Sequence, residues 1–170
     1  MIPPDEAWGI VLEQVRPLEP VEVKLADSPG YCLAEDIRAD RDLPPADRSS
    51  MDGYAVHAAD AQRSPGCRLS VIGEVAAGSA LRPRVKPGAC ARIFTGANIP
   101  PGADAVVMVE ETEECDGVVA IRSSVAQGAY ILRRGEDARK GTVLLPRGAR
   151  IDAGEVGVCA AVGKATVKVH

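Results

Sequence analysis

The sequence contains few of the residue types on which common catalytic sites depend. Its 170 residues include two histidines, His57 and His170, and only 3% aromatic residues. It contains no nucleophile elbow, phosphate-binding loop, dinucleotide fingerprint or His-Glu-x-x-His motif. These absences argue against triad, nucleotide-loop and zincin chemistry. A core so poor in aromatics must be built mainly from Val, Ile, Leu and Ala.

The charge and hydropathy patterns exclude further classes of partner. The formal net charge of −4 provides no basic surface for nucleic acid. No apolar run approaches the length that crosses a bilayer. The acidic N-terminus also lacks the basic and apolar regions of a secretory signal. We therefore expect a cytoplasmic protein that binds neither nucleic acid nor membrane.

The cysteines form neither a disulfide framework nor a zinc motif. There are five, an odd number, and none of them forms a Cys-x-x-Cys pair. We expect most of them to be small buried hydrophobic residues. They are Cys32, Cys67, Cys90, Cys115 and Cys159.

Turn-forming residues are abundant, and they indicate the fold class. Seventeen glycines and thirteen prolines favour short elements joined by many turns. We predict a mixed, β-rich α+β fold of short, coiled sheets and hairpins with a few short helices. Charged breaks near residues 41–50 and 128–137 favour a middle section inserted into a domain made from both chain ends.

Three elements are predicted with particular local signals. A helix begins at Pro3-Pro4-Asp5, ends at Arg16-Pro17, and carries an apolar stripe that we expect to pack on a sheet. A short helix is capped by Asp152 and stopped by Gly163. A strand over residues 105–114 and one that begins at Val118 form a hairpin around the Asp116-Gly117 turn.

Acidic residues gather on the first arm of this predicted hairpin and at its turn. One interpretation is a cation site, and the other, which we favour, is a solvated tip that also blocks edge aggregation. Glu110 is the member nearest the apolar strand. The group comprises Glu110, Glu111, Glu113, Glu114 and Asp116.

Three loops combine glycine with polar side chains. The first places Asp52 before Gly53, and the second places Thr95 before Gly96. The third is the charged stretch 133–141, RRGEDARKG. Arginines bind oxyanions well and carboxylates hold Mg²⁺. Each loop alone is typical of a turn or a charged crossover, whereas their convergence would create a site for an anion and a metal.

Five stretches together resemble one family over nearly the whole chain. They are LPPADRSSMDGYAV, GEVAAG, VKPGACARIFTGANIPPGADAVVMVEET, RRGEDARKGTVLLPRGARI and GEVGVCAAVGKATVKV. The combination of MDGYA, RIFTGA and GED is highly specific. The sequence resembles the N-terminal half of the molybdopterin molybdotransferases, the family of MoeA and the gephyrin E domain.

The resemblance implies two elongated, β-rich domains. A discontinuous N-terminal domain would comprise 1–40 plus 136–170, and the inserted domain would comprise 41–135. The family continues with an α/β molybdopterin-binding domain and a C-terminal barrel, which this chain lacks. The family's enzymes are homodimers whose cleft lies between the third domain of one subunit and the first two of the other. A homodimer is therefore expected.

The resemblance also implies an activity and site residues. The family inserts molybdate into adenylylated molybdopterin and releases AMP in a step that depends on Mg²⁺. Asp52 and Asp137 would be catalytic and would handle the metal or molybdate. The expected substrate-binding residues are Thr95, Arg134, Ser50 and Gly96.

The family's usual PFDNSAMDGYA reads PADRSSMDGYA here. Ala46 replaces an aromatic residue, Arg48 an asparagine and Ser50 an alanine, while Tyr31 replaces an arginine in an earlier motif. Without the α/β domain, supplied in cis or in trans, we expect no complete molybdenum insertion. The alternative is a non-catalytic module for dimerisation or protein binding that works with a separate molybdopterin-binding partner.

Overall fold

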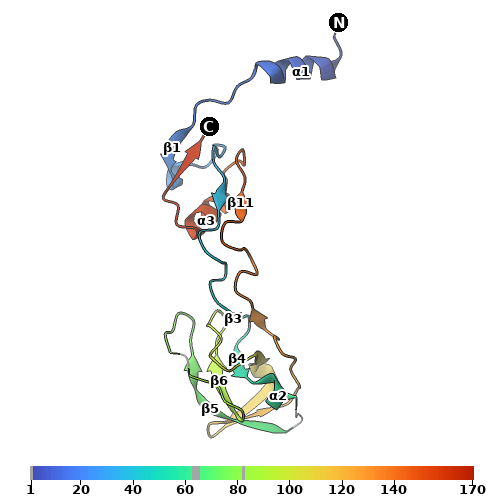
Figure 1. Ribbon diagram of the computed structural model, residues 1–170, viewed down its shortest axis with the longest axis vertical. Coiled ribbons are helices and arrows are strands. Elements are labelled where there is room, and N and C mark those ends of the chain that lie inside the picture. The colour runs from blue at the N-terminus through green and yellow to red at the C-terminus, as the bar shows by residue number, and fades with distance from the viewer. Residues whose placement is uncertain (1, 63–65, 82) are drawn as a thin grey trace. The chain divides into compact units, whose positions relative to one another are not determined.

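The structure, a computed structural model, describes residues 2–62, 66–81 and 83–170. It divides into two compact units (Figure 1). Unit 1 comprises Met1–Arg41 and Gly141–His170, and unit 2 comprises Asp42–Lys140. The predicted division placed residues 136–140 with the chain ends, whereas here they lie in unit 2.

Unit 1 is built from two small antiparallel sheets and a helix. Strand β1 pairs with β12, and β2 pairs with β11. Helix α3 and the 3-10 turn η1 pack with them around a core that includes Leu33, Ile37 and Ile151. The elements are β1 (Val21–Lys24), η1 (Leu25–Asp27), β2 (Ile37–Arg38), β11 (Val143–Leu145), α3 (Ala153–Ala161) and β12 (Thr166–Val169).

Helix α3 confirms the prediction made from its capping residues. The Asp152 side chain accepts from the backbone of Glu155, and the Glu155 carboxylate accepts from Asp152 N at 3.0 Å. This reciprocal pair satisfies two backbone donors that the first turn would otherwise leave unpaired. Gly163 follows the helix with φ +77°, a conformation that glycine adopts without strain.

Helix α1 (Pro4–Gln14) forms as predicted, but its predicted packing is wrong. None of its residues is buried, and Trp8 and Leu12 are 64% and 56% exposed. The apolar stripe fixes which face of the helix is hydrophobic, but it does not specify what covers that face. In the described chain, no sheet packs on it.

Unit 2 contains a sheet of six strands in the order β7-β4-β6-β5-β9-β8. The sheet is curled (Figure 1). The pairs are antiparallel except β5 with β6. Two apolar clusters cover its two faces, one around Tyr54 and Leu69 and the other around Ile93 and Val106. The strands are β4 (Gly53–Val56), β5 (Cys67–Val75), β6 (Ala89–Ile93), β7 (Ala105–Met108), β8 (Thr112–Cys115) and β9 (Val118–Ile121).

Three short elements complete unit 2. Strand β3 (Arg48–Ser49) pairs with β10 (Ile131–Leu132), and helix α2 is Ala58–Ala61. Together with the sheet described above, these elements confirm the β-rich fold class with few helices. None of the helices in the described part of the chain has the length and apolar character that a bilayer crossing requires.

The predicted β8–β9 hairpin is present, with one correction to its first arm. Asp116 and Gly117 both have positive φ, 50° and 75°, as a tight two-residue hairpin turn requires. The predicted continuous strand over 105–114 is wrong, because the 3-10 turn η2 (Val109–Glu111) interrupts it. Val109 N donates to Asp52 O at 3.1 Å, so this break borders the Asp52 loop.

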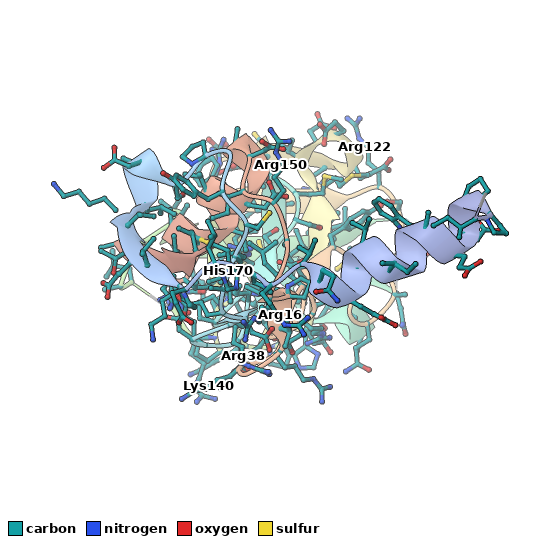
Figure 2. The ribbon with its side chains drawn as sticks, turned by 90° about the horizontal axis from the view of Figure 1, so that it is seen from above. Arg16, Arg38, Arg122, Lys140, Arg150 and His170 are labelled. Carbon is teal, nitrogen blue, oxygen red and sulfur yellow. The ribbon has the colours of Figure 1, made fainter. Side chains whose placement is uncertain are left out.

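Charged side chains on the surface form local pairs. Arg122 pairs with Glu113 at 2.9 Å, and Arg150 lies 3.6 Å from Asp152. Both arginines extend into solvent, with 61% and 70% of their side chains exposed (Figure 2). Exposed pairs of this kind contribute little to stability, so these arginines are neutral reference positions for substitution.

Gly53 begins β4 at a point where two strands approach very closely. A Cβ at this position would lie 1.9 Å from Val107 O, which belongs to the adjacent strand β7. The reason for glycine here is therefore this close approach, since the φ of Gly53 is not positive. Only glycine allows β4 to enter the sheet in this register directly after Asp52.

We predict that Gly53→Ala destabilises unit 2, because the added methyl group forces β4 away from β7. The loss of unfolding free energy should be about 1–3 kcal/mol, measured by chemical denaturation. Gly157→Ala is the control, since a Cβ there meets nothing within 4 Å in helix α3. Equal stability of the two variants would contradict the close approach.

Candidate functional site

Asp52 occupies the bend between β3 and β4, and its carboxylate is held by one residue. Its Oδ1 accepts hydrogen bonds from Thr95 N and from Thr95 Oγ1, both at 2.7 Å. The backbone bond first, and then the hydroxyl bond, lower the pKa of Asp52. Its second oxygen, Oδ2, has no partner among the described residues. The loop therefore presents an ionised carboxylate with one oxygen available.

The loop after β6 is fixed to β3 by its backbone. Gly96 N donates to Ser49 O at 2.8 Å, and Ser49 N donates to Ala97 O at 2.9 Å. Gly96 has φ +82°, which allows the chain to turn back immediately after Thr95. Two of the three loops singled out in the sequence, those of Asp52 and Thr95, thus lie in direct contact.

Ser50 contributes its backbone to this arrangement. Its N–H donates to Tyr130 O at 3.0 Å, while its hydroxyl makes no hydrogen bond to a described residue. The neighbouring Ser49 is 2% exposed, and its hydroxyl donates to Met51 O at 2.5 Å. Ser49, which the sequence did not single out, therefore stabilises the bend that carries Asp52.

The arginines of the third loop bind two carboxylates of the segment 41–50. Arg133 Nη1 lies 2.7 Å from Asp47 Oδ2, and Arg134 Nε lies 2.7 Å from Asp42 Oδ2. Backbone donors complete both sites, Arg134 N on Asp47 and Lys140 N on Asp42. These backbone bonds are the main cause of the lowered pKa of each aspartate, and the arginines add to it. The ionised carboxylates of Asp42 and Asp47 therefore hold the loop 133–141 in place.

Asp137 is not joined to Asp52 by any hydrogen bond or ion pair between described residues. Its backbone N donates to Leu43 O at 3.0 Å, and its side chain is 58% exposed. The nearest charged partner of its carboxylate is Arg48 Nη2, at 3.9 Å. Across the described ranges, no group of three or more His, Cys, Asp or Glu is arranged to hold a metal ion.

A small cavity lies beside Asp52 and includes residues that the sequence analysis missed. Its volume is about 100 Å³, and Arg92 and Phe94 are among the residues that line it. Both residues stand in the RIF stretch just before Thr95. Their short distance in sequence from the Thr95-Gly96 pair is the feature from which the sequence could have identified them as site residues. The lining residues are Asp52, Gly53, Arg92, Ile93, Phe94 and Val109.

Glu114 differs from the predicted solvated tip. Its carboxylate accepts a short hydrogen bond from the Tyr54 hydroxyl, and Tyr54 is only 2% exposed. Burial, followed by this carboxylate, raises the pKa of Tyr54 to about 12. The contact joins β8, at one edge of the sheet, to β4, next to the other edge, so the curl of the sheet brings these two strands within reach of each other. Glu110, the residue singled out before, is exposed.

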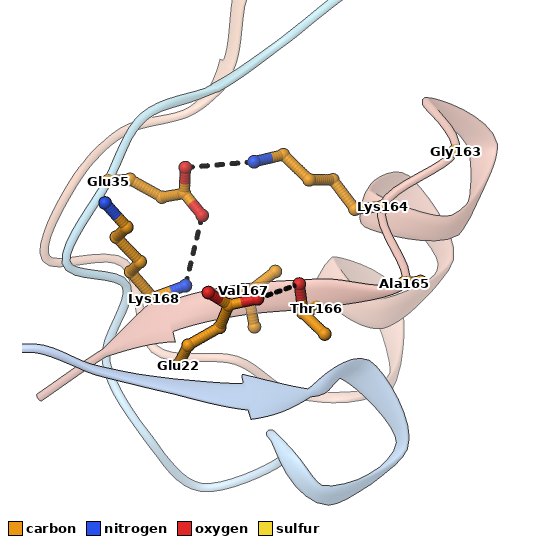
Figure 3. A pocket seen from close by; sticks show the side chains of 8 residues that line it. All are labelled: Glu22, Glu35, Gly163, Lys164, Ala165, Thr166, Val167 and Lys168. Atoms are coloured by element: carbon orange, nitrogen blue, oxygen red, sulfur yellow. Dashed lines mark hydrogen bonds and ion pairs between the residues drawn. The ribbon is translucent and has the colours of Figure 1, made fainter.

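A larger hollow in unit 1 contains none of the predicted site residues. It measures about 220 Å³ and is lined mainly by residues 163–168 (Figure 3). Glu35 binds Lys164 Nζ at 2.9 Å and Lys168 N at 3.0 Å. Partial burial acts to raise the pKa of Glu35, but these two contacts outweigh it and lower the pKa. Glu35 and Lys164 therefore pair with each other within this hollow.

The comparison with known families decides the assignment. The family of MoeA N-terminal regions (domain I and II) matches residues 2–163. The chain belongs to this family. Its sequence motifs and its β-rich fold are therefore those of MoeA domains I and II, as the resemblance implied.

Individual proteins agree with the family assignment. The molybdopterin molybdenumtransferase of Bacillus subtilis (strain 168) is 41% identical over 175 residues, covering 99% of this chain. That of Staphylococcus aureus (strain Mu50) is 38% identical over 171 residues with the same coverage. The crystal structure of the molybdopterin biosynthesis MoeA protein from Pyrococcus horikoshii OT3 matches with a TM-score of 0.93 at 34% identity, over 99% of this chain.

The chain spans only part of these relatives. It covers 41% of each of the two transferases and 46% of the Pyrococcus chain. The family membership therefore concerns the N-terminal region, and the activity of the whole relatives is a separate question.

We predict that Thr95→Val raises the pKa of Asp52 toward its ordinary value, because the variant loses the hydroxyl donor. The measurement is an NMR titration of the Asp52 carboxyl carbon. Because the folded pKa is lowered, the Asp52–Thr95 contact adds stability above the ordinary pKa, and this is lost as the pH falls through the folded pKa. Thr95→Ser should retain the low pKa. An unchanged titration in Thr95→Val would contradict the contact.

Proposed function

We propose that this chain is the N-terminal lobe of an enzyme that inserts molybdate into adenylylated molybdopterin and releases AMP. The observation that carries the proposal is the Asp52 carboxylate, held by Thr95 at 2.7 Å with one oxygen available. The relatives named molybdopterin molybdenumtransferase support the same chemistry. A carboxylate held in this way is preorganised, so it needs no rearrangement to meet a bound substrate.

Each predicted site residue has a role in this proposal. Asp52 handles the metal or molybdate, while Thr95 and Gly96 fix its loop and face the substrate with Ser50. Arg134 and Asp137 offer a second, exposed contact for the anionic substrate or its metal. Side-chain exposures of 66% and 58% support this assignment.

The family resemblance implies magnesium. The carboxylates of this chain fit Mg²⁺ only if substrate phosphates and water supply most of its ligands. Mg²⁺ is usually bound through one or two carboxylates, with water and substrate phosphates as the other ligands. Oδ2 of Asp52 suits an ion that substrate phosphates mainly hold, and Asp137 is the proposed second carboxylate. When bound, the ion would neutralise charge on those phosphates.

The remaining parts of the enzyme must complete the substrate site. Because the chain covers 41% of its transferase relatives, we propose that an α/β molybdopterin-binding domain supplies most of that site, in cis or in trans. The proposed location is the cytoplasm.

The alternative function is a non-catalytic module for dimerisation or protein binding. The exposed apolar face of α1 favours it, with Trp8 64% and Leu12 56% exposed. This face is equally compatible with a catalytic homodimer. The two functions therefore differ only in what they require of Asp52.

A chimera tests the catalytic proposal. This chain replaces the matching region of the Bacillus subtilis transferase, and AMP release from adenylylated molybdopterin with molybdate is measured. We expect activity, and a loss of about 100-fold in Asp52→Asn because the charged oxygen is removed. Asp116→Asn, at the exposed hairpin turn, is the matched control and should retain full activity. A folded chimera without activity, or with equal activity in both variants, would contradict the catalytic role.

We also propose a homodimer in which the apolar face of α1 is covered by a second copy. Light scattering should give twice the mass of one chain, and Leu12→Asp should reduce it to the mass of one chain because a charge in an apolar interface is unfavourable. Leu81→Asp is the control, since Leu81 is 73% exposed on unit 2. A monomeric mass for the unsubstituted chain would refute this proposal.

A further inference from the structure

Arg92 is placed beside Asp52 by the register of the sheet. It stands on β6 directly opposite Tyr54 of β4, so both side chains lie on the same face of the sheet. Two residues further along the chain, Phe94 follows the end of β6. Arg92 and Asp52 line the same cavity, although they come from different segments.

The Arg92 side chain has a fixed direction but retains free donors. Its guanidinium carbon lies 5.6 Å from the centre of the Phe94 ring, and its Nη1 lies 3.9 Å from Glu114 Oε2. The stacking and the ion pair orient the group. Its guanidinium donates no hydrogen bond to any described residue, and 45% of the side chain is exposed. A guanidinium has five N–H donors, so this group can bind a ligand without breaking a hydrogen bond.

Glu114 is itself held in place from the other side. Tyr54, 2% exposed, donates its hydroxyl to the same carboxylate oxygen that faces Arg92. The buried tyrosine cannot follow a moving partner, because the surrounding core is close-packed. The contacts from Tyr54 through Glu114 to Arg92 therefore connect the core of unit 2 to the cavity wall.

The other arginines near the predicted site differ in this respect. Arg133 and Arg134 each donate to an aspartate at 2.7 Å, and Arg48 lies beside Asp137. A ligand on Arg133 or Arg134 would compete with these contacts or use only the remaining donors. Arg92 is the arginine that lines the Asp52 cavity while its hydrogen-bond donors remain available.

We propose that Arg92 is an oxyanion-binding residue of the Asp52 cavity, with Glu114 and Phe94 as its positioning residues. The ligand group is a tetrahedral oxyanion, either a phosphate of the nucleotide or molybdate. A cavity of about 100 Å³ suits one such group rather than a whole cofactor. Arginine matches such oxygens with two parallel N–H donors. This inference rests on the proposed function for the identity of the ligand but not for the existence of the anion site.

The direct test uses the chain itself with two probes, sodium molybdate and inorganic pyrophosphate. The side-chain Nε–Hε signal of Arg92 and the amide signal of Thr95 are followed by NMR, with sodium chloride at matched ionic strength as the blank. We expect both signals to shift with at least one probe, and the probe that binds distinguishes molybdate from phosphate. Shifts equal to the chloride blank with both probes would overturn the proposal.

Variants separate binding from a merely structural role. Arg92→Gln should weaken the apparent affinity by about tenfold or more, the loss expected for charged hydrogen bonds, while Arg92→Lys should recover part of it. Arg122→Gln is the control because Arg122 already pairs with Glu113 at the surface. The amide spectra of the variants report folding. Unaltered affinity in a folded Arg92→Gln protein would overturn the proposal.

The chimera distinguishes failure of this inference from failure of the proposed function. In an active chimera, Arg92→Gln should raise the KM for the ligand that binds, with a smaller effect on kcat. An active chimera with unchanged KM would overturn the role of Arg92 and leave the function intact. An inactive chimera in which Arg92 still binds a probe would overturn the function and leave the anion site intact.

Discussion

The carboxylate of Asp52 accepts both the backbone N–H and the hydroxyl of Thr95, and the candidate site depends on this contact. It joins the bend before β4 to the loop after β6. The close approach of Gly53 to Val107 O fixes the bend from the other side, because no larger residue fits there. One carboxylate oxygen is consequently held in place and the other remains available for a ligand.

Unit 2 uses its charged residues in two different ways. Asp47 and Asp42 bind Arg133 and Arg134, and these ion pairs hold the segments 41–50 and 128–137 together. Arg92 instead stacks on Phe94 near Glu114 and keeps its hydrogen-bond donors available. Arg92 is therefore the proposed anion-binding residue of the Asp52 cavity, and Arg134 offers a second, exposed contact.

Local signals predicted the elements that local interactions form. The Asp116-Gly117 hairpin and the Asp152 cap of α3 depend on residues a few positions apart, and both predictions were confirmed. The pairing of Asp52 with Thr95 spans 43 positions, so the residues alone suggested only two separate loops. The Tyr54–Glu114 contact spans 60 positions and depends on the curl of the sheet, which no pattern in the sequence specifies. The prediction that α1 packs on a sheet was wrong for a related reason, since an apolar stripe does not specify which element covers it.

The candidate site depends most directly on the hydrogen bond from Thr95 N to the Asp52 carboxylate. Scalar coupling across a hydrogen bond, measured by NMR between the Thr95 amide nitrogen and the Asp52 carboxyl carbon, tests it directly. We expect a resolved coupling at neutral pH together with slow exchange of the Thr95 amide proton. The absence of the coupling together with rapid exchange of that proton would contradict it.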